Sequence, residues 1–338
     1  MATLKEVAEA AGVSSATASR ILNQDPALSV QPATRQKVLE VARQLQYSRP
    51  LKASATAGWT LGLLQWFSTT QEMEDTYYLS IRQGIEAYCQ EQRIPLLRAF
   101  KQDLNYIEGV KQADAILCIG RFSKREMEAI CSLCRPVLFL DMPTAHAASS
   151  ITLDFEQAVT AVLDYLCELG HRSIGFLSGV EYLDKEETER FDDPRRTVFL
   201  RYCRAHSIRC EEYLYEGRFS IESGYEMMDA LLKGETRPTA VFAASDPIAI
   251  GAMRAIQDHG LQIPEDMSIA GFNDISLSAF TTPPLTTLHA PSMEMGRYGA
   301  AFVKLLSDME AEVPIKIQLP CKLIVRESCT SPPDSDGF

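Results

Sequence analysis

Several features that would assign this 338-residue sequence to a common functional class are missing from it. No run approaches the roughly 18 to 20 apolar residues that a membrane-spanning helix needs, and two acids interrupt the opening MATLKEVAEAAG, unlike a signal peptide. The sequence has no GxSxG, P-loop or GxGxxG motif, and its five histidines are too dispersed for a metal site. We therefore expect no membrane partner and no enzymatic activity, and we predict no catalytic residue, cofactor or metal.

The nine cysteines are scattered and odd in number, so they do not indicate a disulfide framework. Cys131 and Cys134 form a single CxxC in the helical stretch REMEAICSLC, with no second pair and no nearby histidine, which favours buried thiols over zinc. Because no export signal is recognised, reduced thiols in the cytoplasm are expected. The length, with 46% hydrophobic and 23% charged residues, is typical of two or three globular domains.

The net charge of −12 is unevenly distributed along the chain. Residues 1–58 contain seven lysines and arginines against four acids, a local charge of +3, and the other 280 residues carry −15. A polyphosphate such as DNA is attracted to the basic segment and repelled by the acidic remainder. The uneven charge therefore favours DNA binding and also directs the DNA to residues 1–58.

The basic segment is predicted to form short helices. Thr3 followed by Glu6 makes a capping box, Gly12 suits a left-handed helix end, and Ser14 can cap a second helix almost at once. This is the spacing of a helix-turn-helix, and a third helix begins with Pro32 at its first position. The expected core positions are Leu4, Val7, Ala8 and Ala11, then Val13, Ala18, Ile21 and Leu22, then Val38, Val41, Ala42 and Leu45.

The second of these helices carries the residues expected to contact double-stranded operator DNA. Its outer face presents short side chains followed by Arg20, so the backbone can approach a major groove while the arginine pairs with a guanine edge. The predicted DNA contacts are Thr3, Ser14, Ser15, Ala16, Thr17, Ser19, Arg20, Asn23, Tyr47 and Lys52.

The rest of the chain alternates short apolar runs with segments of helical period. The runs lie at 61–67, 115–119, 137–140, 173–177, 240–243 and 267–272. This alternation predicts an α/β fold of open, doubly wound parallel sheets, which bind ligands beyond the carboxyl ends of their strands. Because the alternation restarts after Pro95 and after Gly170, we expect two similar lobes with a cleft between them.

The stretch TLKEVAEAAGVSSATASRILNQDPALSVQPATRQKVLEVARQLQY resembles the N-terminal domain of the lactose/galactose repressor family of bacterial transcription regulators. The segments DYLCELGHRSIGFLSG, RPTAVFAASDPIAIGAMRAIQDHGLQIPEDMSIAGFNDISLSAFTTPPLTTL and MEMGRYGAAFVKLL are similar to its effector domain, so the resemblance covers residues 3 to about 328. The opening, YYLSIRQGIE and the FND near position 273 are most similar to the branch that includes the repressor of the evolved beta-galactosidase operon.

The resemblance implies an all-α helix-turn-helix head and a two-lobed effector domain of the periplasmic-binding-protein type, with chain crossings near 158, 289 and 320. The expected domains are a DNA-binding domain at 1–50, a hinge linker at 51–58, a sugar-binding and dimerisation domain at 59–328 and a polar tail at 329–338. Lobe 1 is expected at about 59–157 and 289–319, and lobe 2 at about 158–288 and 320–328.

The resemblance also implies a sugar site, and several matching residues follow predicted strands. Arg195 matches the family's arginine that holds vicinal sugar hydroxyls, although by itself it is one cation in a mixed-charge loop. Phe219 matches an aromatic that covers a pyranose, although a lone phenylalanine is usually core. Asp141 directly follows the apolar run at 137–140, and its carboxylate there is equally consistent with a sugar contact and with a turn. Asn273 offers a donor and an acceptor where many family members have aspartate.

Two further positions complete the predicted effector site. Ser245 stands where a family asparagine often contacts ligand, and its neighbour Asp246, before Pro247, is expected to be a helix N-cap. Tyr77 and Tyr78 precede the helix LSIRQGIEAYC, and we expect Tyr77 to close the cleft while one of the two packs inside.

Two departures from the family pattern bear on mechanism. Family members carry a hinge leucine that wedges into the minor groove, whereas this chain has Ala53, Ser54, Ala55 and Thr56 there, and Leu51 falls on another helical face. The tail SCTSPPDSDGF contains no leucine, so it cannot form the coiled coil of tetrameric members, and a homodimer is expected. The predicted function is a sugar-responsive repressor of galactoside genes. The alternative is a sugar-binding protein without regulatory DNA binding, which would not need the basic segment.

Overall fold

The computed structural model describes residues 4–22, 30–44, 58–68, 72, 75–133, 135–144, 148–184, 188–309 and 313–332. The chain divides into two compact units, residues 1–57 and 58–338. Thr3, Asn23, Tyr47 and Lys52, the hinge positions 51–57, Cys134 and the tail after 332 lie outside the described residues, as do the side chains of Ala16 and Ser19. Within the described part, no helix combines the length and apolar character needed to cross a membrane.

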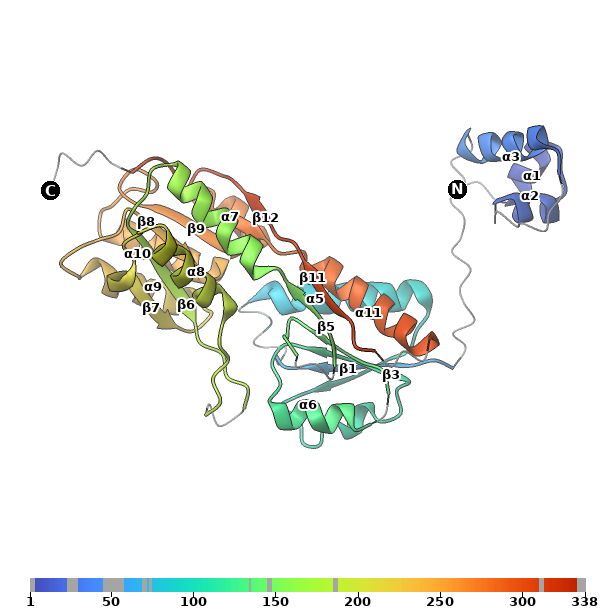
Figure 1. Cartoon of the computed structure of the whole chain (residues 1–338), viewed down its shortest axis with the longest axis horizontal. Helices are drawn as coiled ribbons and strands as arrows, with labels where there is room; N and C mark the ends of the chain where they lie inside the picture. Colours follow the sequence, from blue (N-terminus) through green and yellow to red (C-terminus); the bar gives the residue numbers. More distant parts are fainter. Residues whose placement is uncertain are drawn as a thin grey trace. The chain divides into compact units, whose positions relative to one another are not determined.

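The N-terminal unit contains three helices, drawn in blue in Figure 1: α1 (Leu4–Ala11), α2 (Ser15–Leu22) and α3 (Pro32–Gln44). As predicted, Gly12 has a positive φ of 71° at the end of α1, and Ser14 Oγ accepts the backbone N–H of Thr17 at 3.1 Å to begin α2. The three helices bury a small apolar core of Val7, Ala8, Ala11, Ala18, Ile21, Val38 and Ala42. Helices α1 and α2, with the tight turn between them, therefore form a helix-turn-helix.

The larger unit contains two six-stranded sheets. In lobe 1 the order is β11 (Lys316–Leu319), β5 (Ser149–Leu153), β4 (Val137–Leu140), β3 (Ala115–Ile119), β1 (Leu61–Gln65) and β2 (Leu96–Phe100), all parallel. In lobe 2 the order is β12 (Lys322–Ile324), β10 (Thr286–His289), β9 (Ser268–Asn273), β8 (Ala240–Ala243), β6 (Ile174–Gly179) and β7 (Leu214–Gly217). Only β12, paired with β10, is antiparallel among these strands.

Alternate residues of the central strands face opposite sides of each sheet, and helices cover both sides. In lobe 1, Leu63 and Leu117 pack with α5 (Thr76–Gln92) and α11 (Ser292–Asp308), whereas Leu64 and Ile116 pack with α6 (Lys124–Cys131) and the short helix η1 (Glu108–Val110). In lobe 2 the corresponding pairs are α7 (Phe155–Glu168) with α8 (Pro194–Ala205), and α9 (Ile221–Leu232) with α10 (Asp246–Asp258). The short helices η2 (Glu211–Tyr213) and η3 (Ser276–Phe280) complete lobe 2.

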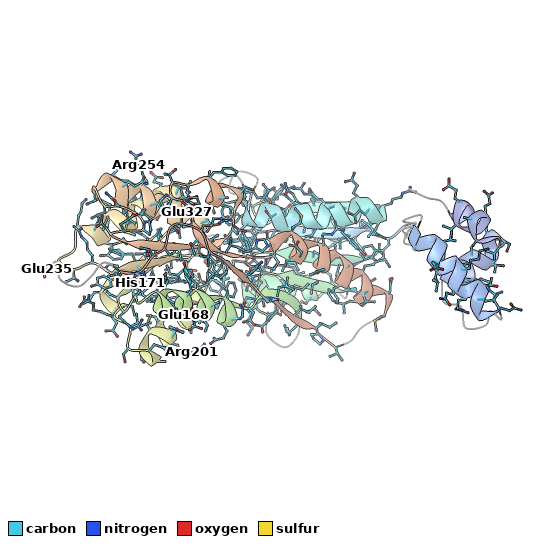
Figure 2. All side chains as sticks on the ribbon, turned by 90° about the horizontal axis from the view of Figure 1, so that it is seen from above. Glu168, His171, Arg201, Glu235, Arg254 and Glu327 are labelled. Carbon is cyan, nitrogen blue, oxygen red and sulfur yellow. The ribbon has the colours of Figure 1, made fainter. Side chains whose placement is uncertain are left out.

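Charged side chains of lobe 2 such as Arg201, Glu235 and Arg254 lie at its periphery (Figure 2). His171 is buried instead, between Thr239 Oγ1 at 2.8 Å and the carbonyl oxygen of Thr330 at 2.9 Å, and burial lowers its pKa. This histidine fixes the end of the chain to lobe 2 and has a structural role.

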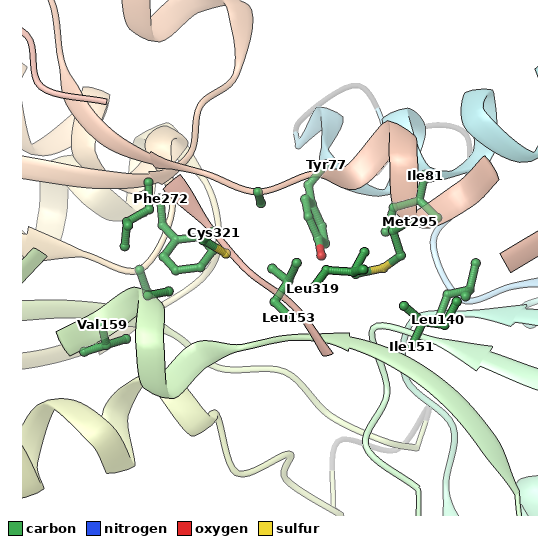
Figure 3. Close-up of a cluster of buried hydrophobic side chains, with 14 of the residues drawn as sticks. Tyr77, Ile81, Leu140, Ile151, Leu153, Val159, Phe272, Met295, Leu319 and Cys321 are labelled. Atoms are coloured by element: carbon green, nitrogen blue, oxygen red, sulfur yellow. The ribbon is translucent and has the colours of Figure 1, made fainter. Parts of the chain in front are cut away.

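The chain passes between the lobes three times: between β5 and α7, between β10 and α11, and between β11 and β12. One apolar cluster continues across these crossings, from Ile151 and Met295 in lobe 1 through Leu319 and Cys321 to Phe272 in lobe 2 (Figure 3). The predicted fold class is therefore confirmed: two doubly wound α/β lobes with their strand ends facing a common interface.

Candidate functional site

Polar side chains from both lobes meet where the strands end. Asp141 follows β4 and Arg121 follows β3 in lobe 1, while Glu181 follows β6 and Asn273 ends β9 in lobe 2. Asp141 and Asn273 have positive φ angles of 56° and 108°, a conformation that costs free energy and tends to occur at functional sites. The cavity between the lobes is lined by Asp75, Tyr77, Tyr78, Arg121, Asp141, Leu153, Phe155, Glu181, Arg195, Phe219, Phe272 and Asn273. Five of the six predicted effector residues are thus brought together.

Arg195 lies in the first turn of α8 and is 7% exposed. Its Nε and Nη2 donate to the carboxylate of the N-cap residue Asp193 at 2.8–2.9 Å, and its Nη1 donates to the carbonyl oxygen of Ala244 at 2.6 Å. Burial by itself would lower the pKa of this guanidinium, but the carboxylates of Asp193, Glu181 and Asp141 together outweigh burial and raise the pKa. Since a guanidinium has five N–H groups, one on each Nη remains without a partner in the described structure, and both can donate to adjacent hydroxyls.

Three phenylalanine rings surround this guanidinium, with centroids 5.1 Å (Phe219), 5.3 Å (Phe272) and 5.6 Å (Phe155) from its central carbon. The ring of Phe219 lies directly against Gly179 at the end of β6, where any Cβ would come within 2.1 Å of the ring. Glycine is therefore required at position 179 to leave room for the ring of Phe219. The three phenylalanine rings and the guanidinium of Arg195 form one continuous surface.

Tyr77 and Tyr78 both lie in the first turn of α5, whose N-cap Asp75 accepts the N–H of Tyr77 at 3.0 Å. The prediction that they precede the helix was therefore wrong. Both rings are buried, whereas one of the two was expected to pack inside. Tyr78 Oη donates to Asp141 at 2.9 Å. Tyr77 Oη is buried without a hydrogen-bond partner in the described structure and points into the space between the lobes (Figure 3). Such an unsatisfied hydroxyl costs about 1–3 kcal/mol unless a ligand bonds to it.

Three charged residues of the cavity, Asp75, Arg121 and Glu181, were not predicted from the sequence. Arg121 Nε donates to Glu181 at 2.7 Å, which joins lobe 1 to lobe 2, and its Nη1 lies 3.2 Å from the carboxylate of Asp141. Burial raises the pKa of Glu181 although Arg121 opposes this change. The sequence positions of Arg121 and Glu181 could have indicated them. Each comes two residues after a buried strand, just as Asp141 comes directly after one.

The described residues 180–184 and 188–193, between β6 and α8, form a segment that we call the arm, and it contacts lobe 1. Lys101 of lobe 1 donates to the carbonyl oxygen of Leu183 at 2.6 Å. Phe191 is buried in the lobe 1 core beside Phe122 and stacks on Arg121, whose central carbon is 4.0 Å from the ring centroid. The arm and the Arg121–Glu181 pair hold the lobes in contact, and the cavity of about 20 Å³ between the lobes has room for only one or two waters.

Ser245 is not part of this group. It is fully buried as the N-cap of α10, with its Oγ 3.5 Å from the N–H of Ile248, and it does not line the cavity. The expectation that Asp246 is the N-cap was therefore wrong. Asp246 instead accepts hydrogen bonds from the hydroxyls of Ser278 and Thr287, each at 2.6 Å, and burial raises its pKa to about 7. Its role is to hold η3 and β10 against α10.

On the helix-turn-helix unit, the structure places Ser14, Ser15 and Arg20 at the exposed side of α2 and leaves Thr17 half-buried. The hydroxyls of Ser14 and Thr17 are 2.8 Å apart. In the described residues of both units, no group of three or more histidine, cysteine, aspartate or glutamate side chains is arranged to hold a metal ion.

Comparison with known proteins gives the family. The profile of bacterial regulatory proteins of the lacI family matches residues 3–50, and that of the periplasmic binding protein-like domain matches residues 163–329. The transcriptional regulator GalR of Streptococcus thermophilus is 36% identical over 332 residues, covering 97% of this chain and 99% of the relative. The repressor MelR of Bacillus subtilis (strain 168) is also 36% identical, with 97% and 98% covered. The solved lac repressor dimer, bound to operator and the anti-inducer ONPF, is 26% identical with a TM-score of 0.69 and 97% and 99% coverage. The chain belongs to the LacI family of bacterial transcription regulators.

Proposed function

We propose that this protein represses galactoside utilisation genes by binding operator DNA, and that a small neutral sugar between its lobes releases it. The observation that carries the proposal is that one chain joins a helix-turn-helix unit to a two-lobed unit whose interface presents unpartnered buried donors. A sugar-binding protein without DNA binding would not need the first unit. Relatives named GalR and MelR support a sugar-linked regulator.

The cavity supplies the groups that a pyranose requires. The two remaining N–H groups of Arg195 match a pair of adjacent hydroxyls, Tyr77 Oη and Asn273 can each donate or accept, and Asp141 accepts. Phe219 offers an aromatic face to the apolar side of the ring. Because a pyranose is far larger than this cavity, the lobes or the side chains that line it have to move apart to admit the sugar.

For DNA binding, α2 enters the major groove with Arg20 toward the base edges. A single short helix reads only a few base pairs, so a homodimer with two-fold symmetry is needed to double the readout. Exposed apolar side chains of lobe 2 provide a surface for a second copy: Ile221 on α9, and Leu277 and Phe280 on η3, with Phe280 82% exposed. The lac repressor was solved as a dimer on operator.

The sugar acts by favouring one arrangement of the lobes over another. The resemblance to the galactoside branch suggests that the sugar is an inducer, so we expect it to weaken operator binding. Coupling free energies of about 1–3 kcal/mol are typical, which correspond to about 5-fold to 150-fold in affinity. We expect the lower half of this range because the hinge sequence lacks the usual leucine.

The test begins with a thermal-shift screen of neutral sugars on the full-length protein. Operator affinity is then measured by gel shift with and without the sugar that stabilises the protein most. A 5-fold or greater loss of affinity for a pseudo-palindromic operator, with no change for random DNA, is expected. If the stabilising sugar leaves operator affinity unchanged, the proposed switch is wrong.

A further inference from the structure

A side chain of lobe 2 completes the second apolar core of lobe 1. Among the described residues, every buried member of this core comes from lobe 1 except Phe191, which belongs to the arm and is 8% exposed. Leu183, also on the arm, packs at the edge of the same core. This core is separate from the apolar cluster that follows the three crossings. The arm therefore joins the two lobes at a place of its own.

The arm is a short hairpin that is built on lobe 2. The N–H of Leu183 donates to the carbonyl oxygen of Glu189 at 2.7 Å, and the N–H of Phe191 donates to that of Glu181 at 2.9 Å. At the base of the arm, the N–H of Val180 donates to the carbonyl oxygen of the last residue of β7 at 2.8 Å. None of these three bonds involves lobe 1. The arm can therefore leave lobe 1 as a unit while it keeps its own backbone hydrogen bonds.

The polar and apolar contacts of the arm with lobe 1 differ in how easily they can be replaced. Lys101 Nζ donates to the carbonyl oxygen of Leu183 at 2.6 Å, but it also lies 2.7 Å from the carboxylate of Glu126. This lysine therefore keeps an ionic partner when the arm leaves. Phe191 has no such replacement, because its ring would move from a packed core into water and leave a cavity behind. Phe191 is thus the contact that decides whether the arm stays in place.

The contact between the arm and lobe 1 is not a ligand contact, because neither Phe191 nor Lys101 is among the described residues that line the inner cavity. With the arm in place, this cavity of about 20 Å³ cannot hold a pyranose, so the structure shows the sugar-free arrangement of the lobes. We propose that the arm fastens the lobes in the arrangement that binds operator, and that withdrawal of Phe191 from lobe 1 lowers operator affinity without any sugar. This inference rests on the proposed function, in which the sugar-free protein is the one that represses.

The test uses the full-length protein without sugar and follows the arm and the operator separately. The sequence has two tryptophans, so Trp59→Phe leaves Trp66 as the single reporter. Trp66 is half-buried, and its ring centroid lies 6.0 Å from the central carbon of Arg121, on which Phe191 stacks. In Phe191→Ala we expect acrylamide to quench the fluorescence of Trp66 more strongly. Affinity for a pseudo-palindromic duplex, selected from random sequences by the wild-type protein, is expected to fall about fivefold or more in gel shifts.

Two further variants separate the arm contact from a general loss of stability. Lys101→Met removes the polar contact with the arm and should change quenching and operator affinity in the same direction but less, and it serves as the test if Phe191→Ala does not fold. Ile130→Ala, in the same core on α6, is the matched control. It should lower the free energy of unfolding and leave both quenching and operator affinity as in wild type.

Each outcome of these measurements decides the inference. Unchanged quenching of Trp66 in the folded variant of the arm contact would overturn it. Stronger quenching with wild-type operator affinity would also overturn it, as would an equal loss of operator affinity in Ile130→Ala. If the wild-type protein selects no duplex, the proposed function is wrong, and the role of the arm in operator binding falls with it. The quenching result distinguishes the two failures, because it needs neither DNA nor sugar.

Discussion

Replacing Arg195 with lysine separates the ion pair that this residue forms with Asp193 from the sugar binding that we propose for it. Lysine keeps a positive charge beside Asp193, which would otherwise be left as a nearly buried, unpaired carboxylate. It loses the planar fork whose two remaining N–H groups face the cavity. Hydrogen bonds to charged groups contribute about 1.5–3 kcal/mol each, so losing both weakens sugar binding by about 3 kcal/mol or more, roughly 100-fold.

Sugar affinity of Arg195→Lys is measured by titration calorimetry, with thermal unfolding as the check on folding and operator binding by gel shift. The expected variant is folded, binds operator as wild type does, and no longer responds to the sugar. Arg196→Lys is the matched control, since its neighbouring guanidinium bonds to Glu216 at 3.2 Å at the surface and should be silent. Sugar affinity within threefold of wild type in Arg195→Lys would refute the assignment of these donors to the ligand.

Three further predictions concern the lobe contact, the core of lobe 2 and DNA recognition. Glu181→Gln weakens the bond to Arg121 by about 2 kcal/mol, so the lobes should part more often, seen as a larger radius of gyration by solution scattering without ligand; an unchanged radius argues against this contact. Burial raises the pKa of Asp246 from 3.8 to about 7, so near pH 6 this carboxyl binds a proton in the folded state but not in the unfolded state, and its contribution to the free energy of unfolding should fall by about 1 kcal/mol from pH 6 to pH 8. Asp246→Asn should lose this pH dependence in denaturant titrations, and an identical slope would contradict the raised pKa. Arg20→Ala should lower the preference for operator over random DNA by about tenfold or more, whereas an equal loss on both DNAs would exclude Arg20 from base readout.

The sequence predicted the central strands well because each is a short apolar run buried on both faces. The predicted runs at 115–119, 137–140 and 240–243 coincide with β3, β4 and β8. Six of the described strands lack such runs and were not predicted. β5 and β10 are largely buried but rich in serine and threonine, whereas the edge strands β11, β12, β2 and β7 contain a charged residue each. Edge strands have a solvated side, so their residues need not be apolar, and the pattern that identifies a buried strand is absent from them.

The sequence predicted the site residues that can be recognised one at a time, and missed those whose role depends on a partner far away in the chain. Arg195 and Phe219 were proposed from the family resemblance and Asp141 from its position after a strand, and the structure brings all three to one cavity. Arg121 and Glu181 were missed because their importance comes from pairing with each other across the lobes, and 60 positions separate them in the chain. Ser245 was proposed from a matching position, but its hydroxyl is used by the helix it begins. Tertiary partners decide whether a polar side chain remains available to a ligand.

The backbone at the site explains how a ligand can act on the arrangement of the lobes. Asn273, with its positive φ, accepts a hydrogen bond at its carbonyl from the N–H of Ala290, which lies in the crossing between β10 and α11. Asp141, also at positive φ, donates its N–H to Ile151 in β5, the strand that leads into another crossing. A sugar bonded to these two side chains therefore acts on backbone that is directly bonded to the connections between the lobes. A shift of either residue that relaxes its φ alters a crossing at once, so no long chain of intermediate contacts is needed to move one lobe against the other.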